Sequence, residues 1–262
     1  MLLRLKVLRF SFVATRAFTF PTPASNKLRG AIGNNLWERE DDAYGRFFGP
    51  TRATGPSGLA DPPRPFVLRA AHLDGSSLQR DGEFYFDLHL FDFQSGWEGI
   101  LQEAMQLTNF AWLQGVREEP LTLNLDGDTG AVPCAGIRFL TPMELKIRGG
   151  IAQQPEFGIL ASRIRDRVST LSQLYGDGPL AIDFAGFGKR AEQITMTRCD
   201  VRHVETQRRS GRTGQTHSLG GFVGEAEYSG ELSEFIPYLR AAQWTGVGRQ
   251  TTWGKGAIAL QG

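Results

Sequence analysis

Two of the four histidines in this chain flank a strongly basic segment. His203 and His217 stand on either side of VETQRRSGRTGQT, which contains Arg208, Arg209 and Arg212. An imidazole titrates near neutral pH and can therefore accept or donate a proton in a reaction. Clustered arginines attract phosphate groups, although the same pattern is also found in solvated surface loops. The segment therefore combines residues for proton transfer with residues for anion binding.

A second segment, TGVGRQTTWGKG at residues 245–256, is rich in glycine and carries two cations. Its spacing does not fit a Walker loop, because five residues rather than four separate Gly248 from Gly254, and Gly256 replaces the hydroxyl residue. The dinucleotide fingerprint also fails, since its third glycine is missing. A simple tight turn is the plain alternative. Backbone amides without side chains, beside a guanidinium and an ammonium, suit a long anion such as a nucleic acid.

These two segments supply the candidate nucleic-acid contacts. We predict that they are Arg208, Arg209, Arg212, Gly246, Gly248, Arg249, Thr251, Thr252, Gly254, Lys255 and Gly256. Within this set, Arg249 and Lys255 supply charge and the glycines allow close approach. We expect Trp253 to pack beneath the loop as an apolar anchor. Because the basic turn and the loop fall in the same half of the chain, His217 is the first candidate for general acid or base and His203 the second.

Composition restricts the classes of protein that fit. The 262 residues are 40% hydrophobic and 22% charged, which indicates a folded globular protein rather than a disordered one. Two cysteines and four scattered histidines offer neither a disulfide framework nor zinc-ligand spacing, so we predict no metal, no cofactor and a reducing, cytoplasmic location. Four basic residues interrupt the first 20 residues, so we expect no signal peptide and no membrane span.

The order of predicted elements repeats once along the chain. Residues 1–130 read as strand, helix, two strands, helix and strand, with a bulge where the first strand changes parity between Val7 and Leu8. Asn26 is expected to cap the first helix. Residues 131–262 repeat the order, and their balance of +4 charges contrasts with −3 in the first half. A split βαβ unit occurring twice predicts an α+β protein of two tandem ferredoxin-like domains with antiparallel sheets, meeting near residue 130, with a C-terminal glycine-rich loop.

Together with particular residues, this layout resembles the CRISPR-associated endoribonucleases that cut repeat RNA, the Cas-six family of the RAMP superfamily. The stretches that carry the resemblance are RPFVL at 64–68, FLTPM at 139–143, LGGFVG at 219–224 and GVGRQTTWGKG at 246–256. The glycine-rich loop is shared across the superfamily, and the other three favour the repeat-processing branch. The resemblance implies binding of CRISPR repeat RNA, metal-independent cleavage by 2′-hydroxyl attack, and association with other Cas proteins.

The sequence departs from the family in one important respect. Many relatives use a histidine from the first helical region, and residues 21–50 contain none. Tyr44 lies nearby and is a reserve catalytic candidate. Two alternatives therefore stay open: a RAMP subunit that grips guide RNA without cutting, and an unrelated enzyme that binds a small phosphate ester. His72 and His89 are interpreted as structural, and Arg163, Arg165 and Arg167 as the outer face of a long helix.

Overall fold

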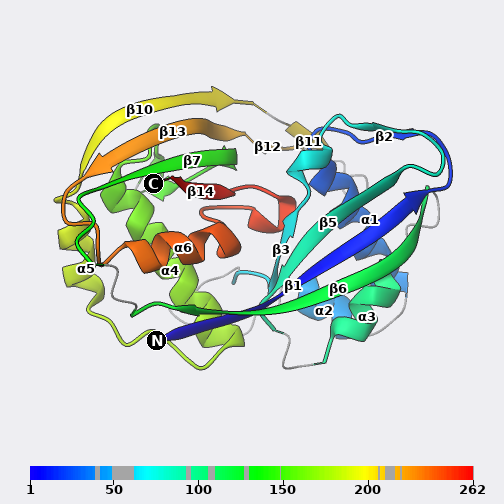
Figure 1. The fold of residues 1–262 in the computed structure, drawn as a ribbon, viewed down its shortest axis with the longest axis horizontal. Coiled ribbons are helices and arrows are strands. Elements are labelled where there is room, and N and C mark those ends of the chain that lie inside the picture. The colour runs from blue at the N-terminus through cyan, green and yellow to red at the C-terminus, as the bar shows by residue number, and fades with distance from the viewer. Residues whose placement is uncertain are drawn as a thin grey trace.

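The computed structural model describes the backbone of residues 1–38, 42–48, 62–92, 96–105, 110–126, 130–147, 149–205, 207–209, 216–218 and 220–261. Two four-stranded antiparallel sheets lie side by side, each with helices against one face (Figure 1). Their strand orders, β3-β5-β1-β6 and β10-β13-β7-β14, are the order that a split βαβ unit produces. The predicted fold of two ferredoxin-like domains is therefore confirmed.

The first domain begins with the long strand β1 and ends with β6. Its elements are β1 (Leu2–Ala14), β2 (Phe18–Thr19), α1 (Ala24–Glu38), α2 (Asp42–Phe47), β3 (Phe66–Arg69), the 3-10 turn η2 (Ala71–Leu73), β4 (Ser77–Leu78), β5 (Glu83–Leu90), α3 (Glu98–Ala104) and β6 (Ala111–Asn124). Leu28, Ile32 and Leu36 recur every four residues on α1 and are buried against the sheet.

The second domain follows the same order of strands and helices. It contains β7 (Cys134–Met143), β8 (Lys146–Ile147), β9 (Gly150–Ile151), α4 (Phe157–Tyr175), α5 (Phe184–Ala191), β10 (Thr195–Val204), β11 (Gln207–Arg209), β12 (Thr216–Ser218), β13 (Gly221–Ser229), α6 (Ile236–Thr245), the 3-10 turn η4 (Thr251–Trp253) and β14 (Ile258–Gln261). The sequence did not predict α5, a short helix that Asp183 caps by accepting a hydrogen bond from the Gly186 amide.

The predicted bulge between Val7 and Leu8 is wrong. The β1–β5 register is continuous there, and the irregularity in β1–β6 pairing falls between Ser11 and Phe12. The change of parity arises because the two faces of β1 are buried in the cores of different domains. Leu8 belongs to the first domain's core, whereas Leu3, on the opposite face, joins the second domain's core. Figure 1 shows this end of β1 running beneath the second domain.

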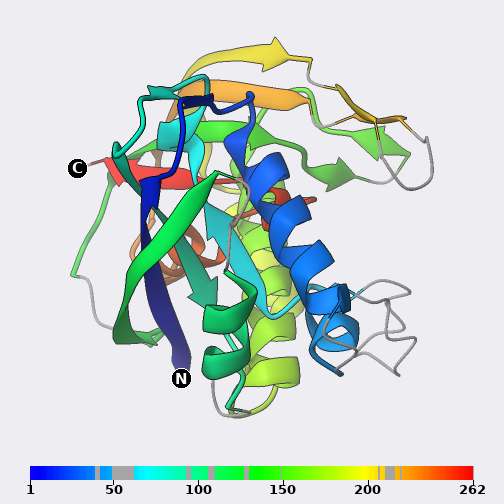
Figure 2. The same cartoon turned by 90° about the vertical axis from the view of Figure 1, so that its right-hand side faces the viewer.

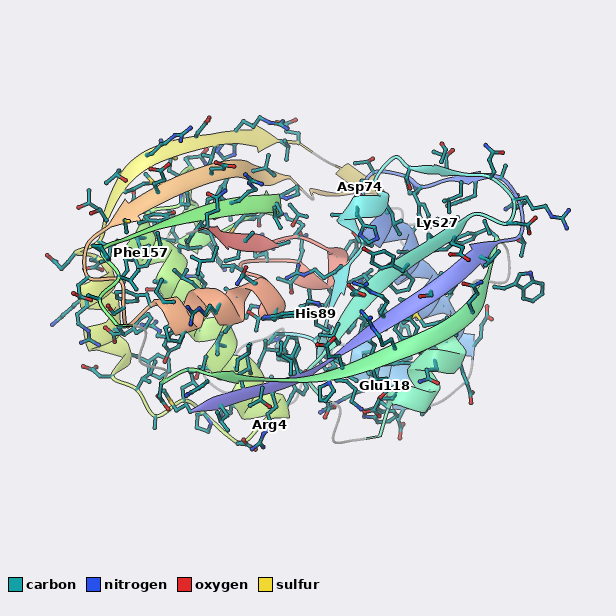
Figure 3. All side chains as sticks on the ribbon, viewed as in Figure 1. Arg4, Lys27, Asp74, His89, Glu118 and Phe157 are labelled. Atoms are coloured by element: carbon teal, nitrogen blue, oxygen red, sulfur yellow. The ribbon has the colours of Figure 1, made fainter. Side chains whose placement is uncertain are left out.

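Two further boundaries differ from the sequence prediction. Helix α1 begins at Ala24, and the Asp74 carboxylate, not Asn26, accepts a hydrogen bond from the first amide, at 2.7 Å. Asp74 reaches α1 from the turn that follows η2 (Figure 3), a contact between distant parts of the chain. The spacing of apolar residues predicts a helix over residues 97–112, but residues 111 and 112 begin β6 because strand pairing with β1 extends to Ala111.

A third cluster of apolar side chains joins the domains. Leu5, Val67, Phe91 and Leu171 are buried together, with Tyr175 and Trp244 packed against them. Figure 3 shows His89 in the same seam, between the first sheet and the end of α6. The seam fixes how α6, and therefore the glycine-rich segment that follows it, lies against the first domain. Within the described residues, no helix is both long and apolar enough to cross a membrane.

Candidate nucleic-acid interface

The glycine loop, residues 246–256, connects α6 to β14 and closes on itself. Gly246, Gly248, Gly254 and Gly256 all have positive φ values between 68° and 81°. The Val247 amide donates to the Gly256 carbonyl at 2.9 Å, and the Gly256 amide donates to the Pro142 carbonyl at 3.1 Å. A Cβ on Gly256 would collide with the Val247 carbonyl oxygen, so this closure requires glycine. The loop therefore has a defined conformation, held by backbone hydrogen bonds.

Glu144 lies beneath both cations of the loop. Its Oε1 accepts from Arg249 Nη1 at 2.5 Å, and its Oε2 lies 3.5 Å from Lys255 Nζ. The Arg249 side chain is 56% exposed, whereas that of Lys255 is 4% exposed. Arg249 is therefore the loop cation that solvent reaches. No local motif marks Glu144, because its carboxylate comes from the residue after β7, more than 100 positions before Arg249.

Lys255 points into the protein. Its Nζ donates to the Gly220 carbonyl at 2.6 Å and to Gln250 Oε1 at 2.9 Å. Burial lowers the pKa of Lys255, and the neighbouring Glu144 partly offsets this effect. In the protein without RNA, this ammonium holds the loop against β13. Contact with RNA stays a prediction for Lys255, and Arg249 has the more accessible position.

Helix α1 of the first domain supports the far side of the loop. The Ser25 hydroxyl donates to the Trp253 carbonyl at 2.6 Å, and the Arg29 guanidinium lies 4.3 Å from the centre of the Trp253 ring. Thr251 and Thr252 are buried in the η4 turn, which contacts both α1 and β3. The expected anchoring role of Trp253 agrees with these contacts. Ser25 and Arg29 carry no local motif that would have identified them.

The basic segment forms a hairpin in which an arginine faces a histidine. Strands β11 and β12 pair in antiparallel register, with Arg208 opposite His217 and Arg209 opposite Thr216. Arg212 lies outside the described residues. The hairpin and α1 lie on the same side of the molecule (Figure 2), and the glycine loop lies between α6 and α1. The two predicted sources of RNA contact, the basic hairpin and the glycine loop, are therefore neighbours, because Lys255 of the loop bonds the Gly220 carbonyl just after β12.

The other catalytic candidates have different surroundings. His203 is exposed near the end of β10, and its Nε2 lies 2.9 Å from the Gln153 carbonyl. Tyr44 lies on α2, where its ring packs 5.7 Å from that of Phe48. The Arg29 guanidinium covers Phe48 as well as Trp253, so Tyr44 is joined to the glycine loop through stacked side chains. His203 and His217 thus lie on strands of the second domain, and Tyr44 lies on a helix of the first.

The carboxyl end of α6, just before the loop, receives three nitrogen donors. Arg69 Nη2 donates to the Gln243 carbonyl at 3.1 Å and Arg167 Nε donates to the Thr245 carbonyl at 2.7 Å. His89 Nδ1 lies 2.8 Å from the Trp244 carbonyl. Burial and the nearby Arg69 lower the pKa of His89 to about 4, so its ring is neutral at pH 7. These contacts place His89 in a structural role.

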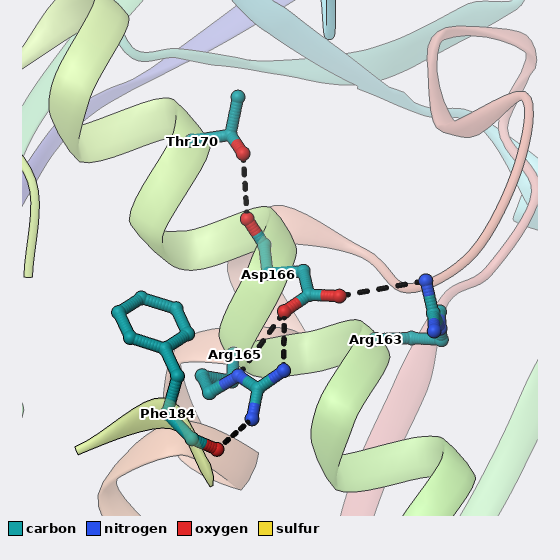
Figure 4. Close-up of polar contacts among 5 residues, drawn as sticks. All are labelled: Arg163, Arg165, Asp166, Thr170 and Phe184. Carbon is teal, nitrogen blue, oxygen red and sulfur yellow. Dashed lines mark hydrogen bonds and ion pairs between the residues drawn. The ribbon is translucent and has the colours of Figure 1, made fainter. Parts of the chain in front are cut away.

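The prediction for the arginines of α4 is only partly right. Figure 4 shows Arg163 and Arg165 turned toward Asp166, with Arg165 Nη1 also donating to the Phe184 carbonyl at 2.6 Å. Arg163 lies on the outer face, whereas the Arg165 side chain is only 12% exposed and the Arg167 guanidinium is enclosed. The Arg167 guanidinium turns inward to the domain seam, because four residues separate it from Leu171, the helix's contribution to the interdomain cluster.

Comparison with known proteins finds a family model that matches part of this chain. Residues 137–258 match the family model of the CRISPR-associated endoribonuclease Cas6, and this range includes His203, His217 and the glycine loop. The resemblance seen in the sequence is therefore confirmed. No curated protein matches the chain.

Solved structures show the same fold over almost the whole chain. A Cas6 product complex aligns with a TM-score of 0.64 at 16% identity, covering 99% of this chain and 100% of the other. A Thermus thermophilus Cas6 aligns with a TM-score of 0.60 at 16% identity and 98% coverage of both chains. A partial Cas6-RT-Cas1–Cas2 complex aligns with a TM-score of 0.62 at 11% identity, covering 98% of this chain and 46% of the other.

Proposed function

We propose that this protein is an endoribonuclease that cleaves CRISPR precursor RNA within its repeats to give guide RNAs. The observation that carries the proposal is the family match over residues 137–258, which contains the glycine loop and both candidate histidines. The two-domain fold shared with Cas6 structures along 98–99% of the chain is consistent with it. Its partners would be repeat RNA and, by analogy with the similar Cas6-RT-Cas1–Cas2 complex, other Cas proteins.

We infer a mechanism in which the RNA's own 2′-hydroxyl attacks the adjacent phosphorus. One group must remove the hydroxyl proton, another must protonate the leaving 5′-oxygen, and donors must offset charge on the phosphorane. His217 is our first candidate for acid or base and His203 the second, with Tyr44 in reserve. A hydrogen bond from His203 Nε2 to the Gln153 carbonyl requires a proton on Nε2, which leaves Nδ1 to accept one in the neutral ring.

Arg249 would neutralise a backbone phosphate as RNA crosses the glycine loop. It begins paired with Glu144, so the phosphate must compete with this carboxylate. An exposed ion pair of this kind is weak, typically below about 1 kcal/mol, so a phosphate can displace it. The basic hairpin would supply further phosphate contacts through Arg208, Arg209 and Arg212.

The test is incubation of the pure protein with repeat RNA in EDTA. We expect cleavage to a cyclic phosphate and a 5′-hydroxyl, and no cleavage when a 2′-deoxy nucleotide replaces the one at the scissile position. The deoxy substrate is a matched control, because it should bind with similar affinity. Activity that EDTA abolishes and magnesium restores would overturn the metal-independent mechanism.

A second candidate is a subunit that binds guide RNA without cutting it. The observation in its favour is that residues 21–50 contain no histidine, although many family members use one there. Tight binding of repeat RNA with no cleavage of the unmodified substrate would support this alternative. If the protein does not bind repeat RNA at all, the remaining alternative is an unrelated enzyme that binds a small phosphate ester.

A further inference from the structure

Two arginines in the domain seam are buried without a full set of partners. Nη1 of Arg69 and Nη2 of Arg167 are shielded from solvent and have no hydrogen-bond partner among the described residues. Each guanidinium makes one contact with the end of α6, to the Gln243 and Thr245 carbonyls respectively. Buried polar groups in native proteins are nearly always paired, so these two nitrogens indicate a missing partner.

The two side chains converge on one place in the seam. Arg69 follows Val67 on the same face of β3, and Arg167 precedes Leu171 by one turn of α4. Val67 and Leu171 pack together in the interdomain cluster, so the two guanidinium groups border the same apolar surface. Their proximity has an electrostatic consequence, because Arg69 adds to burial in lowering the pKa of Arg167 to about 9.

Among the described residues, the acidic side chains of the seam do not neutralise this pair. Asp87 stands opposite Arg69 in the β3–β5 register, but it gives both carboxylate oxygens to Arg9, at 2.7 and 2.8 Å. Asp92 accepts from Arg46 at 2.6 Å. Carbonyls at the end of a helix contribute only about half a negative charge, which is too little for two guanidinium groups.

We propose that a small inorganic anion of the chloride class binds between Arg69 Nη1 and Arg167 Nη2 and joins the two domains. A water molecule would satisfy the hydrogen bonds but not the charge. An RNA phosphate is also a poor fit, because both nitrogens are shielded from solvent and a polymer needs a wider opening than a single ion. The site lies beside the start of the glycine loop, where Arg69 Nη2 is 3.4 Å from the position of a Cβ on Gly246.

The anion would therefore hold the end of α6 and the start of the glycine loop in place. One arginine comes from a strand of the first domain and the other from a helix of the second, and both already hold α6. An ion between them would replace repulsion across the seam with attraction. The ion would bind in the protein without RNA, whether or not the protein is a nuclease.

Two measurements test the site. In thermal melts of the full chain, chloride replaces gluconate at constant ionic strength. The melting temperature should rise by about 3–5 °C for each tenfold increase in chloride above its dissociation constant. Arg167→Gln should abolish this rise, whereas Arg163→Gln, four residues earlier on the outer face of α4, should retain it. An equal rise in Arg167→Gln would overturn the proposal.

The second measurement remains decisive if Arg167→Gln does not fold. Wild-type crystals grown in sodium bromide should show an anomalous peak between Arg69 Nη1 and Arg167 Nη2. A water molecule there, with no anomalous signal, would overturn the proposal.

Discussion

The Ser25 hydroxyl donates a hydrogen bond to the Trp253 carbonyl at 2.6 Å, and this contact ties the first helix of one domain to the glycine loop of the other. The two residues are 228 positions apart in the chain. Around them, Arg29 covers the Trp253 ring and Gly254 passes directly beneath the serine. The loop's shape therefore depends on both domains being packed together.

Gly254→Ala should destabilise this junction. A Cβ at position 254 would lie 2.6 Å from Ser25 Oγ, and the residue has a φ of 81°. The left-handed conformation alone costs about 1–2 kcal/mol for alanine, and the clash adds to it. Denaturant unfolding should show this loss, whereas Gly30→Ala on α1, where a Cβ meets nothing within 4 Å, should be neutral or stabilising. Equal unfolding midpoints for the two variants would contradict the prediction.

Arg249→Ala should weaken RNA binding without unfolding the protein. Loss of one phosphate contact reduces affinity across sequences and lowers the salt slope by about one unit. Binding is measured at several salt concentrations, with thermal melts alongside. Arg240→Ala, an exposed arginine on α6, is the matched control and should leave the slope unchanged. If Arg249→Ala keeps both affinity and slope, the loop does not hold RNA through this residue.

Glu144→Gln should have opposite effects on RNA binding and on stability. Release of the half-exposed Arg249 should raise RNA affinity about two- to fivefold, since such pairs are worth less than about 1 kcal/mol. The buried Lys255 loses its carboxylate neighbour, which should lower the free energy of unfolding by about 1–3 kcal/mol. Binding and denaturant titrations on one preparation measure both. A fall in affinity would show that Glu144 does not restrain Arg249.

His217→Ala should reduce the rate of cleavage by about 10²–10⁴-fold if His217 is the general acid or base. The dissociation constant for RNA should change little, which separates chemistry from binding. His203→Ala tests the second candidate in the same single-turnover assay. His72→Ala is the control, because that ring lies in the first domain against the Tyr85 carbonyl. If His217→Ala and His203→Ala both cleave at the wild-type rate, Tyr44 becomes the candidate for acid or base. The variant Tyr44→Phe then tests it in the same assay.

His89 should make the fold sensitive to mild acid. Its pKa in the folded protein is about 4, below the ordinary value of 6.5, so the unfolded chain binds more protons between these pH values. Stability from this residue is complete above pH 6.5 and is lost as the pH falls toward 4, by at most about 3 kcal/mol. Denaturant unfolding from pH 7 to pH 4 should therefore show a flatter profile for His89→Gln. His72→Gln should keep the wild-type slope.

The sequence alone predicted the order of elements and the location of the loop. Hydrophobic periodicity is a local property, so α1, α4 and the sheet strands were recognisable from spacing within single segments. Four glycines within eleven residues marked a backbone of unusual conformation, and all four have positive φ. The family resemblance likewise depended on short stretches that need no knowledge of tertiary contacts.

Only the tertiary structure decided which charges are available and which are enclosed. In the sequence, Arg249 and Lys255 are equivalent cations of one loop, yet one is half exposed and the other bonds the Gly220 carbonyl inside the protein. The parity change in β1 looked like a bulge, but it records burial of opposite faces in two different cores. Glu144, Ser25 and the inward turn of Arg167 depend on packing between distant segments. The whole fold determines this packing, so the residues next to these positions in the sequence do not predict it.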